Sequence, residues 1–160
     1  SIWFCTVRIV LSGIGSGFLI GNESYGIFCA DKDHTINLNT TYTGVSAYNS
    51  LSNALPGNFP LTNDEIVFVN YFFNHIPDYI PGWSYDNPTE AALVQDVIWG
   101  ITDAATFTPS GEALTILNQV MANGADYNVP PGGYAGIIFW GDETDPQVQL
   151  IFSVVDPCEN

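Results

Sequence analysis

Apolar residues recur at helical spacing in three stretches, all between residues 62 and 124. The first stretch starts at Thr62-Asn63-Asp64-Glu65, a capping box in which the threonine and glutamate side chains satisfy the first backbone amides of a helix. We expect this helix to reach His75 and to be ended by Pro77, because proline cannot donate the next helical hydrogen bond. Its buried face is predicted to contain Ile66, Val69, Phe72 and Phe73.

The second and third stretches are also bounded by residues that favour helix ends. These residues are Asn87 and Thr102 for the second, and Ser110 and Asn123-Gly124 for the third. In the second, Pro88 suits the first helical position and Glu90 completes a box-like start. The apolar stripe predicted for the third consists of Leu114, Leu117, Val120 and Met121. The middle of the chain is therefore predicted to form about three helices.

Alternating, β-branched and aromatic residues predict strands at both ends of the chain. The expected strands are residues 1–11, 18–20, 25–30, 134–140 and 147–155, the last two joined by an acidic hairpin turn. Between the two groups, residues 37–60 are expected to form a long, ordered loop. This order predicts one α+β domain over residues 1–160, in which the N- and C-terminal strands share a sheet or a barrel around a helical middle. The apolar start, residues 1–12, must be covered by its own sheet or act as an arm on a neighbouring subunit.

The strongly negative net charge of the chain limits the classes of molecule that it is expected to bind. The chain has 17 acidic residues and two basic ones, Arg8 and Lys32, which give a net charge of −15. Such a chain has no basic patch to neutralise phosphates, so nucleic-acid binding is not expected. No apolar run approaches the roughly 18 residues of a membrane span, so no membrane insertion is expected either. Hydrophobic residues make up 46% of the chain, enough for a folded core despite the charge.

A glutamine interrupts the apolar face of the second predicted helix. Gln95 shares that face with Ala91, Ala92, Ile98 and Trp99, the residues three and four positions away. Burying its amide without partners costs about 1–3 kcal/mol, so we expect another element to bind it. The predicted strand that ends near Phe28-Cys29 is the candidate.

These two segments resemble those of the thioester domains found in bacterial and archaeal surface proteins. Residues 28–36 (FCADKDHTI) are similar to the family's opening "YC-x-D-x-DH-x-I" motif, and residues 94–103 (VQDVIWGITD) are similar to its "QxAIWxxTD" motif. The resemblance implies an internal thioester in which Cys29 provides the sulfur and Gln95 the acyl group. It also implies a surround for this bond formed by Phe28, His34, Ile98 and Trp99.

The remaining cysteines and the sequons fit an exported chain. If Cys29 is used by the thioester, Cys5 and Cys158 form an even pair that closes one subunit on itself or joins two subunits, unless both are ordinary thiols. Asn22 and Asn39 head glycosylation sequons. Residues 1–11 lack the charged start of a signal peptide, so we expect Ser1 to follow a cleavage site. The expected location is extracellular, at the cell surface.

Two functions are compatible with these features. The first is a structural surface subunit that binds copies of itself in a filament, sheath or surface layer and contains the Cys29–Gln95 thioester. The alternative is an excised adhesin tip that attaches covalently, through the thioester, to an amine on a host or another surface. The chain lacks the Ser–His–Asp pattern, a phosphate loop and paired-cysteine metal motifs, so we expect no enzymatic activity, cofactor or metal. Asp31, Asp33 and His34 are too close in sequence to converge readily on one ion.

Overall fold

The computed structural model describes residues 5–8, 24–33, 42, 45–51, 55–141 and 149–154. These residues form five strands and three helices. In chain order the elements are β1 (Cys5–Arg8), β2 (Ser24–Cys29), β3 (Ser46–Asn49), α1 (Asn63–Tyr79), α2 (Pro88–Thr102), α3 (Gly111–Asn123), β4 (Tyr134–Trp140) and β5 (Gln149–Val154).

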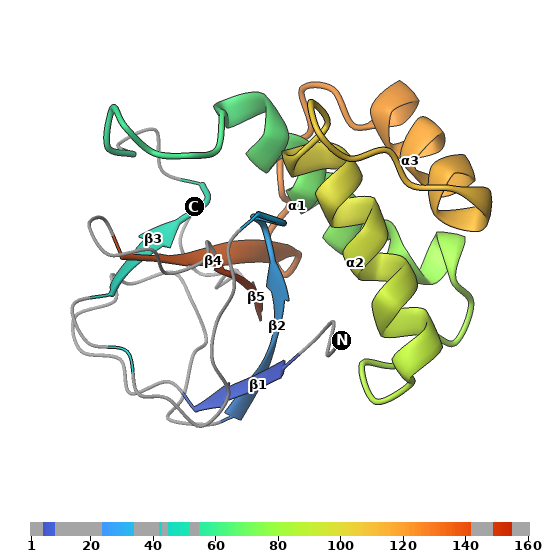
Figure 1. Cartoon of the computed structure of the whole chain (residues 1–160), viewed down its shortest axis with the longest axis horizontal. Helices are drawn as coiled ribbons and strands as arrows, with labels where there is room; N and C mark the ends of the chain where they lie inside the picture. Colours follow the sequence, from blue (N-terminus) through green and yellow to red (C-terminus); the bar gives the residue numbers. More distant parts are fainter. Residues whose placement is uncertain are drawn as a thin grey trace.

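The five strands form one antiparallel sheet in the order β1-β2-β5-β4-β3. The N- and C-terminal strands meet at its centre, where Phe28 of β2 pairs with Leu150 of β5. The three helices pack together beside this sheet (Figure 1). The predicted α+β class is therefore confirmed, as is the shared sheet. Among the described strands the sheet is open, with β1 and β3 as its outer strands, so the barrel that the sequence also allowed is not formed by these residues.

The first helix is longer than predicted. Its capping box at Thr62 and Glu65 is present, but the helix continues through Pro77 to Tyr79. Pro77 lies in the last turn, where one missing amide is tolerated because the turn still closes: the Ile80 N–H donates to the Ile76 carbonyl at 2.8 Å. Ile76 is fully buried, so continuing the helix keeps an apolar side chain in the core.

The second helix has the predicted bounds, and the Asn87 side chain accepts hydrogen bonds from the amides of Thr89 and Glu90. The partner predicted for Glu90 is wrong. In place of the Asn87 N–H, the Glu90 carboxylate accepts a hydrogen bond from the Ser84 N–H at 2.7 Å, which attaches the loop before α2 to the helix.

The predicted buried face of the third helix is confirmed in part. Leu117 and Val120 are buried as predicted, together with Ala113 and Ile116, whereas Leu114 is half-buried and Met121 is 45% exposed. The Ser110 side chain forms no capping hydrogen bond. A Cβ placed on Gly100 would lie 2.6 Å from a Leu117 methyl, so the missing side chain lets Leu117 pack closely on α2.

A strand also forms within the segment predicted to be a loop. β3 pairs with β4, from Ser46 opposite Trp140 to Asn49 opposite Ile137. Its Tyr48 ring packs against the rings of Phe59 and Trp140, with centroids 5.2 and 6.2 Å away. The short Ser-Ala-Tyr-Asn segment has no alternating pattern of its own, so its partner strand determines its conformation.

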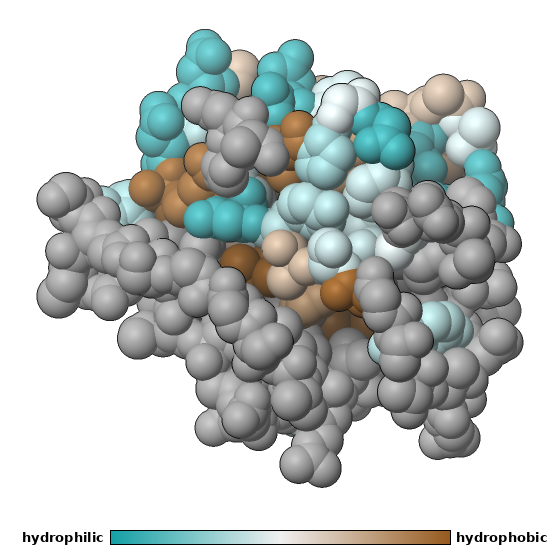
Figure 2. All heavy atoms as spheres, turned by 90° about the vertical axis from the view of Figure 1, so that its left-hand side faces the viewer, coloured by the Kyte–Doolittle hydropathy of each residue, from teal (hydrophilic) through white to brown (hydrophobic). Residues whose placement is uncertain are grey.

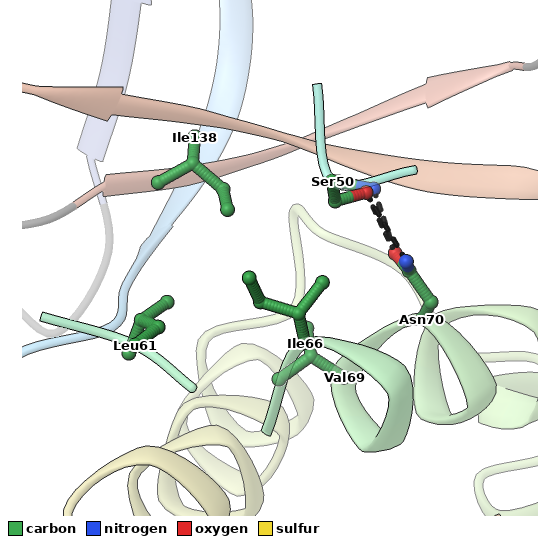
Figure 3. Close-up of a pocket in the computed structure, with 7 residues that line it drawn as sticks. Ser50, Leu61, Ile66, Val69, Asn70 and Ile138 are labelled. Carbon is green, nitrogen blue, oxygen red and sulfur yellow. Dashed lines mark hydrogen bonds between the residues drawn. The ribbon is translucent and has the colours of Figure 1, made fainter. Parts of the chain in front are cut away.

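Two asparagines of α1 hold the part of β4 that lies beyond its pairing with β3. The Asn74 amide accepts from the Tyr134 N–H at 2.8 Å and donates to the Tyr134 carbonyl at 2.7 Å. Asn70 Oδ1 accepts from the Gly136 N–H at 2.9 Å. The same oxygen accepts from the Ser50 hydroxyl at 3.2 Å (Figure 3). Asn70 and Asn74 are one helical turn apart and so face two alternate residues of the strand.

We predict that Asn70→Ala lowers the free energy of unfolding by about 1–3 kcal/mol, because the buried Gly136 N–H loses its partner. Denaturant unfolding would measure this loss. Asn123→Ala, which removes an exposed asparagine from the end of α3, is the matched control and should change stability by less than about 0.5 kcal/mol. Equal effects of the two substitutions would contradict a specific role for Asn70.

Candidate functional site

The Gln95 side chain binds the backbone of Cys29, 66 residues away in sequence. The Cys29 N–H donates to Gln95 Oε1 at 2.9 Å, and Gln95 Nε2 donates to the Cys29 carbonyl at 2.7 Å. Gln95 is completely buried, whereas Cys29 is half-buried. The structure therefore brings together the two residues that the sequence predicts as partners, and satisfies the buried amide through both its donor and its acceptor.

The position of the pair follows from how α2 lies along β2 (Figure 1). Gln95 belongs to the buried side of α2, between the fully buried Val94 and Ile98. The pairing of β1 with β2 extends from Arg8 opposite Ser24 to Cys5 opposite Ile27, so Cys29 lies two residues beyond the last of these pairs. The Gln95 amide binds the N–H and carbonyl there in the way that a neighbouring strand would.

A second side chain binds the same strand and was missed by sequence reasoning. The Ile27 N–H donates to the Tyr85 hydroxyl at 3.0 Å, and that hydroxyl donates to the Ile27 carbonyl at 3.1 Å. A Cβ on Gly26 would lie 2.4 Å from the Tyr85 ring, so the glycine makes room for it. A glycine inside a strand often marks such a close approach, and this is the signal that could have pointed to a partner.

The predicted surround of the pair is placed only in part. Phe28 and Ile98 are fully buried in the main core, and Trp99 is nearly so. The Phe28 ring meets Tyr85 edge-on, with centroids 5.4 Å apart, and lies 6.5 Å from Trp83. Since successive side chains of a strand point to opposite faces, the side chain of Cys29 projects from the face of β2 opposite that of Phe28.

The residues after Cys29 are attached to the end of α2. Asp103 Oδ2 accepts from the Lys32 N–H at 3.0 Å, and the Lys32 ammonium lies 5.7 Å from the centroid of the Phe107 ring. Burial raises the pKa of the Asp103 carboxyl. The Lys32 N–H partly offsets this rise, while Asp31 and Asp33 add to it. The chain therefore runs along α2, from Cys29 beside Gln95 to Lys32 beside Asp103.

Several predicted site residues lie outside the described part of the chain. These are Asn22, His34, Asn39 and Cys158, and the side chain of Cys5 is likewise not described. The proposed Cys5–Cys158 disulfide and the two glycosylation sites therefore stay predictions. Within the described residues, no group of three or more His, Cys, Asp or Glu side chains is arranged to bind a metal, and no helix has the length and apolar character needed to cross a membrane.

A small recess lies between α1 and the sheet, and neither Cys29 nor Gln95 is among the residues that line it (Figure 3). It has an empty volume of about 180 Å³, which includes open solvent, and holds no space for a water molecule. It is lined by Ser50, Leu61, Ile66, Val69, Asn70, Gly136 and Ile138. The recess is a packing irregularity and offers no room for a ligand.

The Cys29–Gln95 arrangement suits transfer of the Gln95 acyl group to sulfur. The acyl carbon is held against the residue that carries the thiol, and the Cys29 N–H already donates to Gln95 Oε1, the oxygen that would gain negative charge during attack. The Cys29 carbonyl holds the nitrogen that would leave. One residue thus provides the nucleophile and also binds both ends of the amide.

Replacing Gln95 by leucine tests its structural role. In a Cys29→Ala background, where no thioester can form, we expect the free energy of unfolding to fall by about 1–3 kcal/mol, because the backbone N–H and carbonyl of residue 29 lose their partner. Denaturant unfolding measures the change. Gln119→Leu, on the exposed side of α3, is the control, and an equally small effect at both positions would contradict this role.

The raised pKa of Asp103 predicts a pH dependence of stability. The fold favours the protonated acid, so its stabilising contribution is present at acidic pH and is lost as the pH rises through the raised pKa. The amide oxygen of Asp103→Asn still accepts from Lys32 but does not ionise. We expect the variant to be more stable than the wild type near neutral pH, with a difference that shrinks below about pH 4.

Chemical unfolding at both pH values, with the exposed Asp78→Asn as the control, would check this expectation. A difference between the Asp103 variant and the wild type that is independent of pH would contradict it.

Comparison of the chain with protein-family models, with curated proteins and with solved structures finds no match. The thioester-domain interpretation therefore rests on the motif resemblance and on the geometry of Cys29 and Gln95.

Proposed function

We propose that this chain is an extracellular surface subunit of the thioester-domain type, in which Cys29 and Gln95 form an internal thioester. The observation that carries the proposal is the pair of hydrogen bonds between the Gln95 amide and the Cys29 backbone. The residue whose backbone binds this buried amide is a cysteine, and its thiol is the group that the reaction requires. The motif resemblance around residues 28–36 and 94–103 supports the same pair.

In the proposed reaction the Cys29 sulfur attacks Cδ of Gln95. The new S–C bond forms, the C–N bond breaks, and the amide nitrogen leaves as ammonia after taking up the thiol proton. The Cys29 N–H stabilises the carbonyl oxygen while it is negatively charged. No oxidant, metal or cofactor is needed for this exchange of an amide for a thioester.

The burial of Gln95 favours a thioester that serves as an internal cross-link. Its side chain is completely buried, so an outside nucleophile would have to reach an acyl carbon within the core. The bond would join β2 to α2 and close a loop of 66 residues. Closing a loop of this length restricts the unfolded chain and stabilises a fold by about 4 kcal/mol in the chain-entropy model. A surface subunit exposed to proteases and shear would gain from such a link.

The half-buried side chain of Cys29 supports the second candidate, an adhesin tip whose acyl group passes to an amine on another surface. Here the amine attacks Cδ of Gln95, the C–S bond breaks, and the Cys29 thiolate leaves. A covalent polymer of this chain through the same chemistry is less well supported. Lys32 is the only lysine in the sequence, so it would have to provide the side-chain amine in every copy.

Self-association therefore rests on other features. Among the described strands, β1 and β3 are the outer strands of the sheet, and an outer strand is the kind of edge to which a strand of a second copy can add. A disulfide between Cys5 of one copy and Cys158 of another would make such contacts permanent, as the sequence suggests.

Intact-mass measurement of the purified chain tests the proposal. We expect the wild type to be lighter than its sequence mass by one ammonia, and Cys29→Ala to have the full mass. Peptide mapping should locate the change at Cys29 and Gln95. A full-mass wild type with an intact Gln95 amide would overturn the thioester.

Reaction with methylamine distinguishes a thioester that serves as an internal cross-link from one that serves as an acyl donor. A buried cross-link should resist methylamine in the native chain and react only after unfolding. An acyl donor should add methylamine at Gln95 while the protein is folded. Mass measurement under reducing and non-reducing conditions also reveals covalent oligomers that depend on cysteine.

A further inference from the structure

We propose that Tyr85 is a positioning residue for the reaction between Cys29 and Gln95. This inference rests on the proposed function and concerns a residue outside the two motifs that carry the family resemblance. The hydrogen bonds described for Tyr85 are to the backbone of Ile27, and so its role is to position the strand. Its hydroxyl binds β2 two residues before Cys29 and so controls how the strand is presented to Gln95.

The two contacts lie on one edge of the strand. Ile27 and Cys29 are two residues apart, and alternate residues of a strand direct their N–H and carbonyl groups to the same side. Tyr85 binds both groups of Ile27, at 3.0 and 3.1 Å, and Gln95 binds both groups of Cys29, at 2.9 and 2.7 Å. Four hydrogen bonds therefore attach this end of β2 to side chains from α2 and the loop before it.

The loop that carries Tyr85 is tied to the start of α2. The Ser84 N–H donates to the Glu90 carboxylate at 2.7 Å, and the Asn87 N–H donates to the Ser84 carbonyl at 3.0 Å. The Tyr85 ring is held between Gly26, where a Cβ would overlap it, and Phe28, which it meets edge-on. The hydroxyl and the Gln95 amide are therefore fixed to one structural unit.

The Tyr85 contacts restrain the end of β2 in addition to its strand pairing. β2 pairs with β5 as far as Cys29, whereas its described pairing with β1 ends at Ile27. Loss of the Tyr85 contacts at Ile27 would let the Cys29 N–H shift relative to Gln95 Oε1. Displacements of about 1 Å at a reacting pair can lower a rate by about a hundredfold, so loss of this restraint should slow acyl transfer more than it destabilises the fold.

The test compares Tyr85→Phe with Tyr79→Phe. Tyr79 is a matched control because its hydroxyl also forms a hydrogen bond, to the Tyr71 hydroxyl at 3.2 Å, but not with β2. Each full-length protein is synthesised and isolated in denaturant, so that the Gln95 amide is intact before the chain has folded. It is then folded by dilution under reducing conditions, and the loss of ammonia is followed by intact mass. Circular dichroism shows when each protein is folded, and hydrogen exchange of the Cys29 amide reports its bond to Gln95.

We expect Tyr85→Phe to fold but to lose ammonia at least about tenfold more slowly than the wild type, with faster exchange at the Cys29 amide. Tyr79→Phe should match the wild type in both measurements. If Tyr85→Phe does not fold, Gly26→Ala displaces the Tyr85 ring while keeping its hydroxyl, and it should show the same slow reaction.

The outcomes separate this inference from the proposed function. If the wild type loses ammonia and Tyr85→Phe reacts equally fast, the positioning role is overturned while the thioester stands. If slow reaction is matched by an equal loss of stability and no change in Cys29 exchange, Tyr85 is only structural and the inference is again overturned. If the wild type never loses ammonia, the thioester is overturned, and the positioning role with it.

Discussion

The hydrogen bonds between the Gln95 amide and the Cys29 backbone are the interaction on which the arrangement of sheet and helices depends. An amide that is completely buried costs about 1–3 kcal/mol if it lacks partners, so the fold is more stable by about this amount when β2 and α2 meet at this point. The contact determines where α2 lies along the strand. It also places the loop after Cys29 beside the end of α2, where Asp103 binds the Lys32 amide.

Side chains bind the backbone of strands at two other places. Asn70 and Asn74 bind β4 beyond its pairing with β3, and Tyr85 binds Ile27, where the described pairing of β1 with β2 ends. In each case the side chain comes from a helix or from the loop beside it and forms hydrogen bonds with backbone groups of the strand. Helices joined to strands in this way cannot slide without breaking hydrogen bonds, which gives directional precision that apolar packing alone does not provide. The thioester proposed for Cys29 and Gln95 would need that precision, and a purely structural pair would need less of it.

The acidic composition also bears on the proposed thioester. Lys32 is the only lysine in the sequence, so few side-chain amines are present to consume such a bond. Lys32 is close to Cys29 in sequence, but its backbone is tied to Asp103, eight residues beyond Gln95 and about 12 Å further along α2. Its ammonium lies over the Phe107 ring. The one side-chain amine of the chain is thus held toward the far end of the helix from the Gln95 acyl group.

The sequence by itself determined the elements with strong local signals: three helices with their capping residues, the strands that became β2, β4 and β5, and the anomaly of a glutamine on an apolar face. It also led to Cys29 as the partner of Gln95, through motif resemblance. Tertiary structure alone decided that α1 continues through Pro77, that β3 forms, that Leu117 packs closely on Gly100, and that Tyr85 binds Ile27. Capping and periodicity depend on residues within a few positions of one another. The other features depend on residues that come into contact only when separate elements pack, so no local pattern records them.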